Sequence, residues 1–250
     1  MSAPRRAPTV LLLLAAMAAA LLPRAASASK ADAFEGKIQP VSGKLFQTGG
    51  RFEGTLGGGL SLNDAFFQKR VGDVKLGWHF TDAWYAGVQA TAGAAVPTNS
   101  TTVCPTGAGC RPATETQLRQ VPGRLRSIVG VEGAWTPIYG KLNTFSEKVA
   151  HVDLSVVAGV DRFGYDEVLS TADAEAGKKP ASLSSWGVHA GIGVRLFLAE
   201  WMALRLDLRD YVYGVTVPNG LAGADGTDVQ NQLFAQLGVS FFLPLQRRQP

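Results

Sequence analysis

The chain has 250 residues, of which 46% are hydrophobic and 18% are charged, and its formal net charge is +4. Three of its 24 basic residues (Arg5, Arg6 and Arg24) and none of its 20 acidic residues lie within residues 1–28, so 21 basic residues face 20 acidic ones in the remainder. Because the charges are nearly balanced, the chain has no excess of positive charge that would indicate nucleic-acid binding.

Residues 1–28 have the three-part pattern of an export signal. Arg5 and Arg6 precede an apolar run from Thr9 to Leu22, and Ala26-Ser27-Ala28 fits a small-residue cleavage site. The apolar run is shorter than the roughly 20 residues that a membrane-spanning helix needs. We predict a signal peptide at 1–28, a periplasmic segment at 29–49, a barrel domain at 50–243 and a tail at 244–250.

The chain after the signal alternates between apolar and polar residues with a period of two. In 202–209, Leu204, Leu206 and Leu208 share one face, whereas Arg205 and Asp207 share the other. The pattern predicts strands at about 51–62, 71–80, 83–96, 123–135, 149–163, 184–198, 201–213 and 229–243. These lengths suit tilted strands that cross a bilayer, which need roughly 9–11 residues.

The predicted connections alternate in length. Thr81-Asp82 and Ala199-Glu200 are short links, and 136–148 is a medium one that contains a turn at Pro137–Lys141. The other links are polar: 97–122, 164–183 and 214–228 are long, and 63–70 is the shortest of this set. Bacterial outer-membrane barrels have short periplasmic turns, long extracellular loops and an even strand number. The predicted fold is therefore all-β: an eight-stranded antiparallel, transmembrane, up-and-down β-barrel.

Aromatic residues gather at the predicted strand ends, as in the interfacial girdles of membrane barrels. The girdle is predicted to comprise Phe52, Phe80, Trp84, Trp135, Trp201 and Phe241 near the periplasmic ends, with Trp186 near the outer ends.

The polar strand faces carry charges of both signs, seven positive and six negative. A soluble lipocalin-like barrel would turn this face outward, but a nearly balanced set suits an enclosed network of ion pairs. The predicted lumen network comprises Arg51, Glu53, Asp73, Lys75, Arg124, Arg126, Glu132, Asp153, Asp161, Arg195, Arg205, Asp207 and Arg209.

Two cysteines occupy one long polar link. Cys104 and Cys110 flank Pro-Thr-Gly-Ala-Gly, and this short stretch contains no histidine or acid that would complete a metal site. In an oxidising exported compartment the pair is predicted to form a disulfide.

Three histidines, His79, His151 and His189, have inward parity. Together with acids on the same faces and Ser155 they could form a hydrolase or acyltransferase site. No spacing singles out a nucleophile, so we interpret them as hydrogen-bonded interior residues, and we predict no catalytic residue, metal or cofactor.

Five short segments support a resemblance to a known family: G-R-F-E at 50–53, S-L-N-D-A-F-F at 61–67, W-H-F-T-D at 78–82, P-I-Y-G-K-L at 137–142 and H-V-D-L at 151–154. Over roughly 36–243 the chain resembles the small "outer membrane beta-barrel domain" proteins of myxobacteria, barrels of the OmpA/OmpX type. The resemblance implies an outer-membrane location and a small barrel, but no established activity. The loop that bears Cys104 is not a feature of that family.

Eight strands enclose a space that side chains can fill, so a wide diffusion pore is not expected. We predict an integral protein of the Gram-negative outer membrane, exported through the general secretion pathway, with a non-enzymatic structural or interaction role. The alternatives are a narrow, porin-like channel or small-ligand transporter, and an outer-membrane hydrolase or acyltransferase. The expected partners are outer-membrane lipid and a periplasmic or extracellular protein, with the barrel itself a monomer and no nucleic acid bound.

Overall fold

The computed structural model describes residues 46–98, 101–104, 109–144, 148–218 and 226–244. The predicted signal peptide lies outside these ranges, as do most of the segments 29–49 and 244–250. In the described part the elements are β1 (Phe52–Ser61), β2 (Phe67–His79), β3 (Trp84–Pro97), β4 (Thr102–Val103), β5 (Arg111–Pro112), α2 (Glu115–Leu118), β6 (Leu125–Thr144), β7 (Lys148–Asp166), α3 (Thr171–Glu175), β8 (Ser182–Ala199), β9 (Met202–Thr216) and β10 (Thr227–Leu243).

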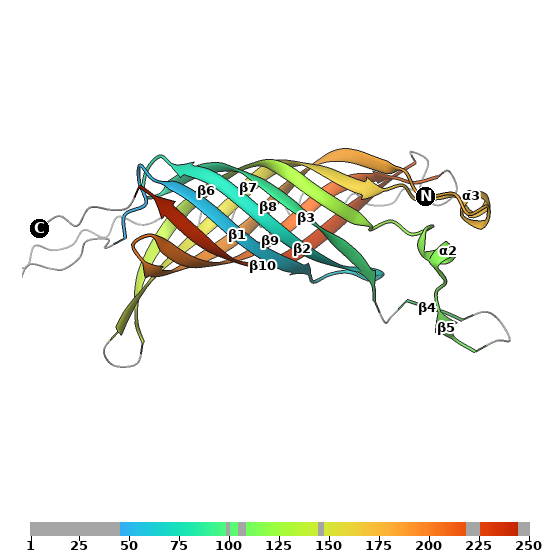
Figure 1. Cartoon of the computed structure of the whole chain (residues 1–250), viewed down its shortest axis with the longest axis horizontal. Coiled ribbons are helices and arrows are strands. Elements are labelled where there is room, and N and C mark those ends of the chain that lie inside the picture. Colours follow the sequence, from blue (N-terminus) through green and yellow to red (C-terminus); the bar gives the residue numbers. More distant parts are fainter. Residues whose placement is uncertain (1–45, 99–100, 105–108, 145–147, 219–225, 245–250) are drawn as a thin grey trace, which may run out of the picture. The chain divides into compact units, whose positions relative to one another are not determined.

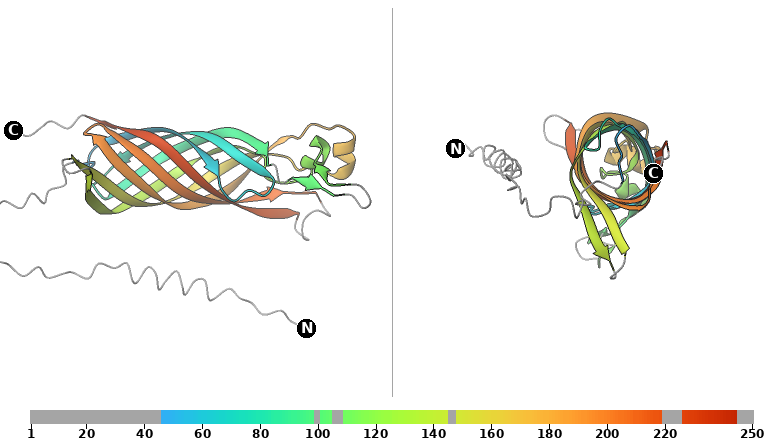
Figure 2. Two further views of the ribbon diagram at one scale, coloured as in Figure 1. Left: turned by 90° about the horizontal axis from the view of Figure 1, so that it is seen from below. Right: turned by 90° about the vertical axis from the view of Figure 1, so that its left-hand side faces the viewer.

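Eight of these strands close into an antiparallel barrel in the order β1-β2-β3-β6-β7-β8-β9-β10, and β10 pairs back with β1 (Figure 1). Viewed end-on, the strands form a complete ring (Figure 2, right). Each barrel strand pairs with the preceding and following barrel strands of the sequence. The prediction of an eight-stranded up-and-down barrel is confirmed. Among the described residues, no helix has the length and apolar character needed to span a membrane.

The register of the strand ladders determines how far the strands tilt from the barrel axis. We start at Trp84 of β3 and step from each residue to its register partner on the next strand. One circuit of the ring returns to β3 at Ala94, ten residues further along the same strand. Such a stagger over eight strands requires a tilt of about 40° to the barrel axis.

The period-two pattern sorts side chains between the two sides of the wall. In β9, Arg205, Asp207 and Arg209 are buried inside, whereas Leu206 and Leu208 point outward and are 52% and 38% exposed. Successive side chains of a strand point to opposite faces, so the alternation read in the sequence becomes the division between interior and exterior.

The connections differ at the two ends of the barrel. At one end, which we call the short-turn end, residues 80–83 and 200–201 link β2 to β3 and β8 to β9. At the other, the loop end, the links span 62–66, 98–124, 167–181 and 217–226, and two of them contain β4, β5, α2 and α3. Helix α2 begins with a capping box between Thr114 and Gln117. The alternation of connection lengths agrees with the prediction.

Strand β6 is longer than predicted, and the turn predicted at Pro137–Lys141 is wrong. β6 continues to Thr144 and pairs with β7 as far as Lys148. A register shift between Trp135 and Ile138 accommodates Pro137, which has no N–H to donate to a ladder. Because β3 pairs with β6 only as far as Trp135 and β7 pairs with β8 only from His151 onward, the tip of the β6–β7 hairpin projects beyond the ring (Figure 1). β2 also differs, starting at Phe67 rather than at 71.

Candidate functional site

The barrel interior has a charged middle and two apolar ends. At the short-turn end, Phe197, Ala203 and Phe242 form a buried cluster, with Phe46 packed against it. A larger cluster fills the loop end and consists of Leu125, Ile128, Phe163, Tyr165, Val168, Tyr211, Tyr213, Val215, Val217 and Phe234.

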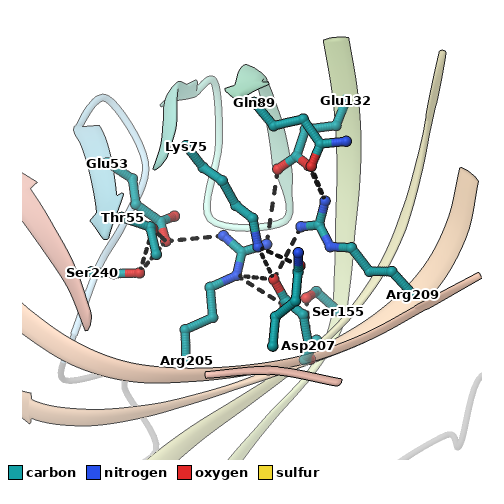
Figure 3. Close-up of polar contacts among 12 residues, drawn as sticks. Glu53, Thr55, Lys75, Gln89, Glu132, Ser155, Arg205, Asp207, Arg209 and Ser240 are labelled. Atoms are coloured by element: carbon teal, nitrogen blue, oxygen red, sulfur yellow. Dashed lines mark hydrogen bonds and ion pairs between the residues drawn. The ribbon is translucent and has the colours of Figure 1, made fainter. Parts of the chain in front are cut away.

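Between these clusters lie ten of the thirteen predicted interior charges, which we call the lumen charge network. Figure 3 shows part of it, around Glu53, Asp207 and Arg209. Each member is at most 4% exposed. The members are Glu53, Asp73, Lys75, Glu132, Asp153, Asp161, Arg195, Arg205, Asp207 and Arg209. Strands β1, β2, β6, β7, β8 and β9 all contribute, so the network ties together most of the ring.

Asp207 is the centre of the network. Its carboxylate accepts from Lys75 Nζ at 2.6 Å, from Arg205 Nε at 3.0 Å and from Arg209 Nη2 at 3.0 Å (Figure 3). A Cβ at Gly193 would lie 2.5 Å from Asp207 Oδ1, so the glycine on β8 leaves the space that this carboxylate occupies. Three cations around one carboxylate offset the cost of burying it.

Glu53 forms a second centre nearer the short-turn end. It accepts from Arg195 Nη1 at 2.8 Å, from Arg205 Nη1 at 3.2 Å and from Ser240 Oγ at 2.7 Å. Oε2, the oxygen that accepts from Arg195, also lies 2.6 Å from His79 Nε2. Arg205 therefore connects Glu53 to the cluster around Asp207.

A third group lies towards the loop end. Arg209 Nη1 donates to Glu132 and, at 2.9 Å, to Gln89 Oε1. The amide of Gln89 donates to Asp161 at 2.6 Å, and His189 Nδ1 lies 2.5 Å from the same carboxylate. Gln89 thus joins an arginine and a carboxylate that do not meet directly.

Arg51, Arg124 and Arg126 were predicted to belong to the network, and the structure contradicts this. Arg51 donates to backbone carbonyls, among them Glu200 O at 2.8 Å and Phe242 O at 3.1 Å. Arg124 donates to the exposed carboxylate of Glu115.

Arg126 is exposed and pairs with Asp166. A register shift between Leu125 and Ser127 reverses the parity on which its inward placement was predicted. The network consequently holds four cations and six carboxylates, rather than seven and six. His79 and His189 are interior residues beside these carboxylates: His79 contacts Glu53, and His189 contacts Asp161 and lies 3.9 Å from Glu132.

The neutral members of this site were not predicted from the sequence. Gln89 on β3, and Gln236 on β10, which accepts from Lys75 at 3.0 Å, are buried with the charges. The sequence signal that could have found both glutamines is their inward position in the period-two pattern, next to predicted interior charges. The buried ion pair of Lys69 with Asp64 at the loop end was missed as well, because these residues fell in a predicted loop.

The seven predicted girdle residues all lie on the outer surface and are 40–68% exposed: Phe52, Phe80, Trp84, Trp135, Trp186, Trp201 and Phe241. Two pairs of rings stack across neighbouring strands. The centroids of Trp84 and Trp135 are 6.2 Å apart, and those of Trp201 and Phe241 are 6.0 Å apart. Six of the seven lie at the short-turn end.

Cys104 and Cys110 form the predicted disulfide, with their Cα atoms 4.1 Å apart, beside the two-residue β4–β5 ladder. Among the described residues, no serine hydroxyl is hydrogen-bonded to a histidine, and Ser155 Oγ donates to the Gly193 carbonyl at 3.2 Å. His151 lies 2.5 Å from the hydroxyl of Tyr139 on the projecting hairpin. The described part of the chain also contains no cluster of three metal-ligating side chains.

Three solved structures are similar to this chain. The N-terminal β-barrel domain of Pseudomonas aeruginosa OprF is 11% identical, with 78% of this chain and 98% of that one covered and a TM-score of 0.45. Neisserial surface protein A is 11% identical (77% and 94% covered, TM-score 0.40), and OprG from Pseudomonas aeruginosa is 12% identical (78% and 97%, TM-score 0.39). At these identities the likeness carries no information about activity.

No protein-family model and no curated protein matches the chain. Membership in the myxobacterial family therefore stays a prediction. The distribution of side chains itself defines a class: a closed barrel with charges sealed inside and aliphatic and aromatic residues outside is the arrangement of a transmembrane β-barrel.

Proposed function

We propose that the protein is an integral barrel of the Gram-negative outer membrane with a non-enzymatic structural or interaction role. The observation that carries the proposal is a barrel wall with apolar side chains on its outer face and charged side chains on its inner face. Leu56, Val131, Ile192 and Leu237 are about half exposed on the outside, while ten charged residues are buried inside. In water this exterior would be a large apolar patch prone to association, whereas in a bilayer it faces lipid.

A closed lumen fits this role better than a channel or transporter. Arg209, Phe163, Phe234 and Phe242 have no exposed surface, and an apolar cluster lies at each end of the lumen charge network. A conducting path would need water along the whole axis. A lumen packed in this way supports a barrel that acts through its ends.

Both ends offer surfaces for a partner. At the loop end, the link 98–124 contains a disulfide and a capped helix, and the link 167–181 contains α3. Leu169 N donates to Arg119 O at 3.0 Å, which joins these two links. At the short-turn end the β6–β7 hairpin projects past the ring. We infer an extracellular protein as partner for the first surface, or a periplasmic protein for the second, with the barrel itself monomeric.

The proposal is tested by the behaviour of the folded protein on gels and in membranes. An unheated sample in dodecyl sulfate should migrate differently from a boiled one, because a closed barrel resists the detergent until it is heated. The protein should also stay with outer-membrane vesicles through washes with carbonate and urea. A protein that is released by these washes and is monomeric in buffer without detergent would contradict the proposal.

A further inference from the structure

Arg70 on β2 points away from the interior and is exposed, next to the inward-facing Lys69. It makes no hydrogen bond or ion pair with any residue in the described part of the chain. Two other outward arginines near the loop end differ in this respect. Arg126 pairs with Asp166, and Arg162 donates to Ser184 Oγ at 3.0 Å.

The depth of Arg70 follows from its strand. It lies eight residues from Trp78, an outward residue near the short-turn end, and at ~3.3 Å rise and ~40° tilt this corresponds to roughly 20 Å along the barrel axis. The apolar band of such barrels is about 25 Å tall. Arg70 therefore lies near the outer edge of the band, where a long cationic side chain reaches the headgroups.

A groove in the outer wall begins at this arginine. It has a volume of about 600 Å³, within the range of ligand-binding clefts, and is lined by Gly58, Leu60, Leu62, Arg70, Leu206 and Leu237 among others. Gly58 has outward parity, and since it has no side chain it leaves a trough between the leucines. Leu60 is the register partner of Arg70. Gly58 and its partner Leu237 lie two residues nearer the short-turn end, so the groove runs from Arg70 towards the middle of the membrane.

We propose that Arg70 and this groove bind one lipid with a net negative phosphate headgroup. The guanidinium group holds the phosphate in a bidentate manner, and one acyl chain lies over Gly58 between Leu60 and Leu237. Charge complementarity selects this occupant, because an unpaired cation at the edge of an apolar wall is stabilised by an anionic headgroup. The rest of the groove is lined mainly by apolar side chains, which suit an acyl chain. The inference depends on the proposed membrane location.

The test is native mass spectrometry of the full-length mature protein, folded in detergent and mixed with equal amounts of diphosphoryl lipid A and phosphatidylcholine. Arg70→Gln removes the cation, and Ala235→Leu fills the groove from its side. Ala235 is used because a Cβ at Gly58 would come within 3.0 Å of the Val71 carbonyl oxygen. Arg162→Gln is the matched control, since it removes an outward arginine that already has a protein partner.

The parent and Arg162→Gln should retain lipid A in preference to phosphatidylcholine. In Arg70→Gln the ratio of retained lipid A to retained phosphatidylcholine should be about fivefold lower, which is the effect of one arginine near an anionic surface. Ala235→Leu should lower retention of both lipids. Equal retention of the two lipids by the parent, or an unchanged preference in Arg70→Gln, would overturn the inference. A parent without a heat-modifiable folded form would instead refute the membrane location, so the two failures are distinguishable.

Discussion

Glu53 on β1 and Arg195 on β8 form an ion pair across the barrel interior, with 2.8 Å between Oε2 and Nη1, although 142 positions separate them in the sequence. Strands β9 and β10 lie between β1 and β8 in the ring. No strand ladder brings these residues together. Their contact depends on closure of the barrel, so the ion pair links the first strand to a distant part of the wall.

Removing Glu53 should therefore destabilise the barrel. Glu53→Ala leaves Arg195 and Arg205 without a shared carboxylate, and breaking a buried pair costs about 3–5 kcal/mol. Urea unfolding in lipid vesicles, followed by tryptophan fluorescence, measures the change in the free energy of unfolding. Glu115→Ala is the control, because its exposed pair with Arg124 is worth about 0–1 kcal/mol. Equal effects of the two changes would show that the lumen charge network does not stabilise the fold.

Leu206→Arg tests which face of the wall meets lipid. Leu206 points outward and is 52% exposed, and a charge at the middle of the membrane costs roughly 2–4 kcal/mol of folding free energy in a bilayer. Val229→Arg is the matched control near the loop end, where the cost falls to about 0–1 kcal/mol. The same vesicle unfolding assay compares them. A Leu206→Arg protein as stable as the parent would place this face away from lipid.

The disulfide between Cys104 and Cys110 should rigidify a loop without supporting the barrel. It lies in the link 98–124, outside the ring, and closes a short stretch of chain. Unreduced protein should show the bridged peptides two hydrogens lighter in mass spectrometry. The Cys104→Ser, Cys110→Ser double variant should keep the heat-modifiable mobility of the parent, while its link 98–124 is cleaved faster by added protease. A double variant that no longer folds would show that the bridge supports the barrel itself.

The sequence predicts well which side chains face outward and which face inward, because the two directions alternate from one residue to the next along each strand. Arg205, Asp207 and Arg209 were placed inside on this basis alone, and they form the centre of the network. The prediction failed where the period is interrupted. A register shift turned Arg126 outward, and another let β6 continue past Pro137. The first irregularity has no characteristic residue, and Pro137 at the second is equally consistent with a turn.

The partners inside the barrel could not be predicted, because they depend on the stagger of the closed ring. Parity places Gln89 inside, but only the ten-residue stagger brings it to both Arg209 and Asp161. Parity likewise places His189 inside without revealing that it lies beside Asp161. The sequence therefore indicates which residues enter the lumen, and the register determines which of them meet.

The projecting β6–β7 hairpin is testable by hydrogen exchange. Residues 138–144 of β6 pair with 148–154 of β7, so their amides should exchange more slowly than those of residues 113–124, which form one short helical turn and join no barrel ladder. They should also exchange faster than the amides within the ring, because the extension lacks a neighbour on the β3 side. Mass spectrometry of peptic fragments from the folded protein gives all three rates. Exchange in 138–144 as fast as in the loop would restore the turn predicted from the sequence.

Conductance across a planar bilayer tests most directly whether the lumen of this barrel is sealed. The purified, heat-modifiable protein should insert without measurable current, because apolar clusters close both ends of the lumen charge network. Co-flotation of the protein with vesicles of the same lipid controls for insertion. Steady, ohmic current through the unmodified protein, carried by single channels of uniform size, would show a water-filled path along the axis and contradict the claim.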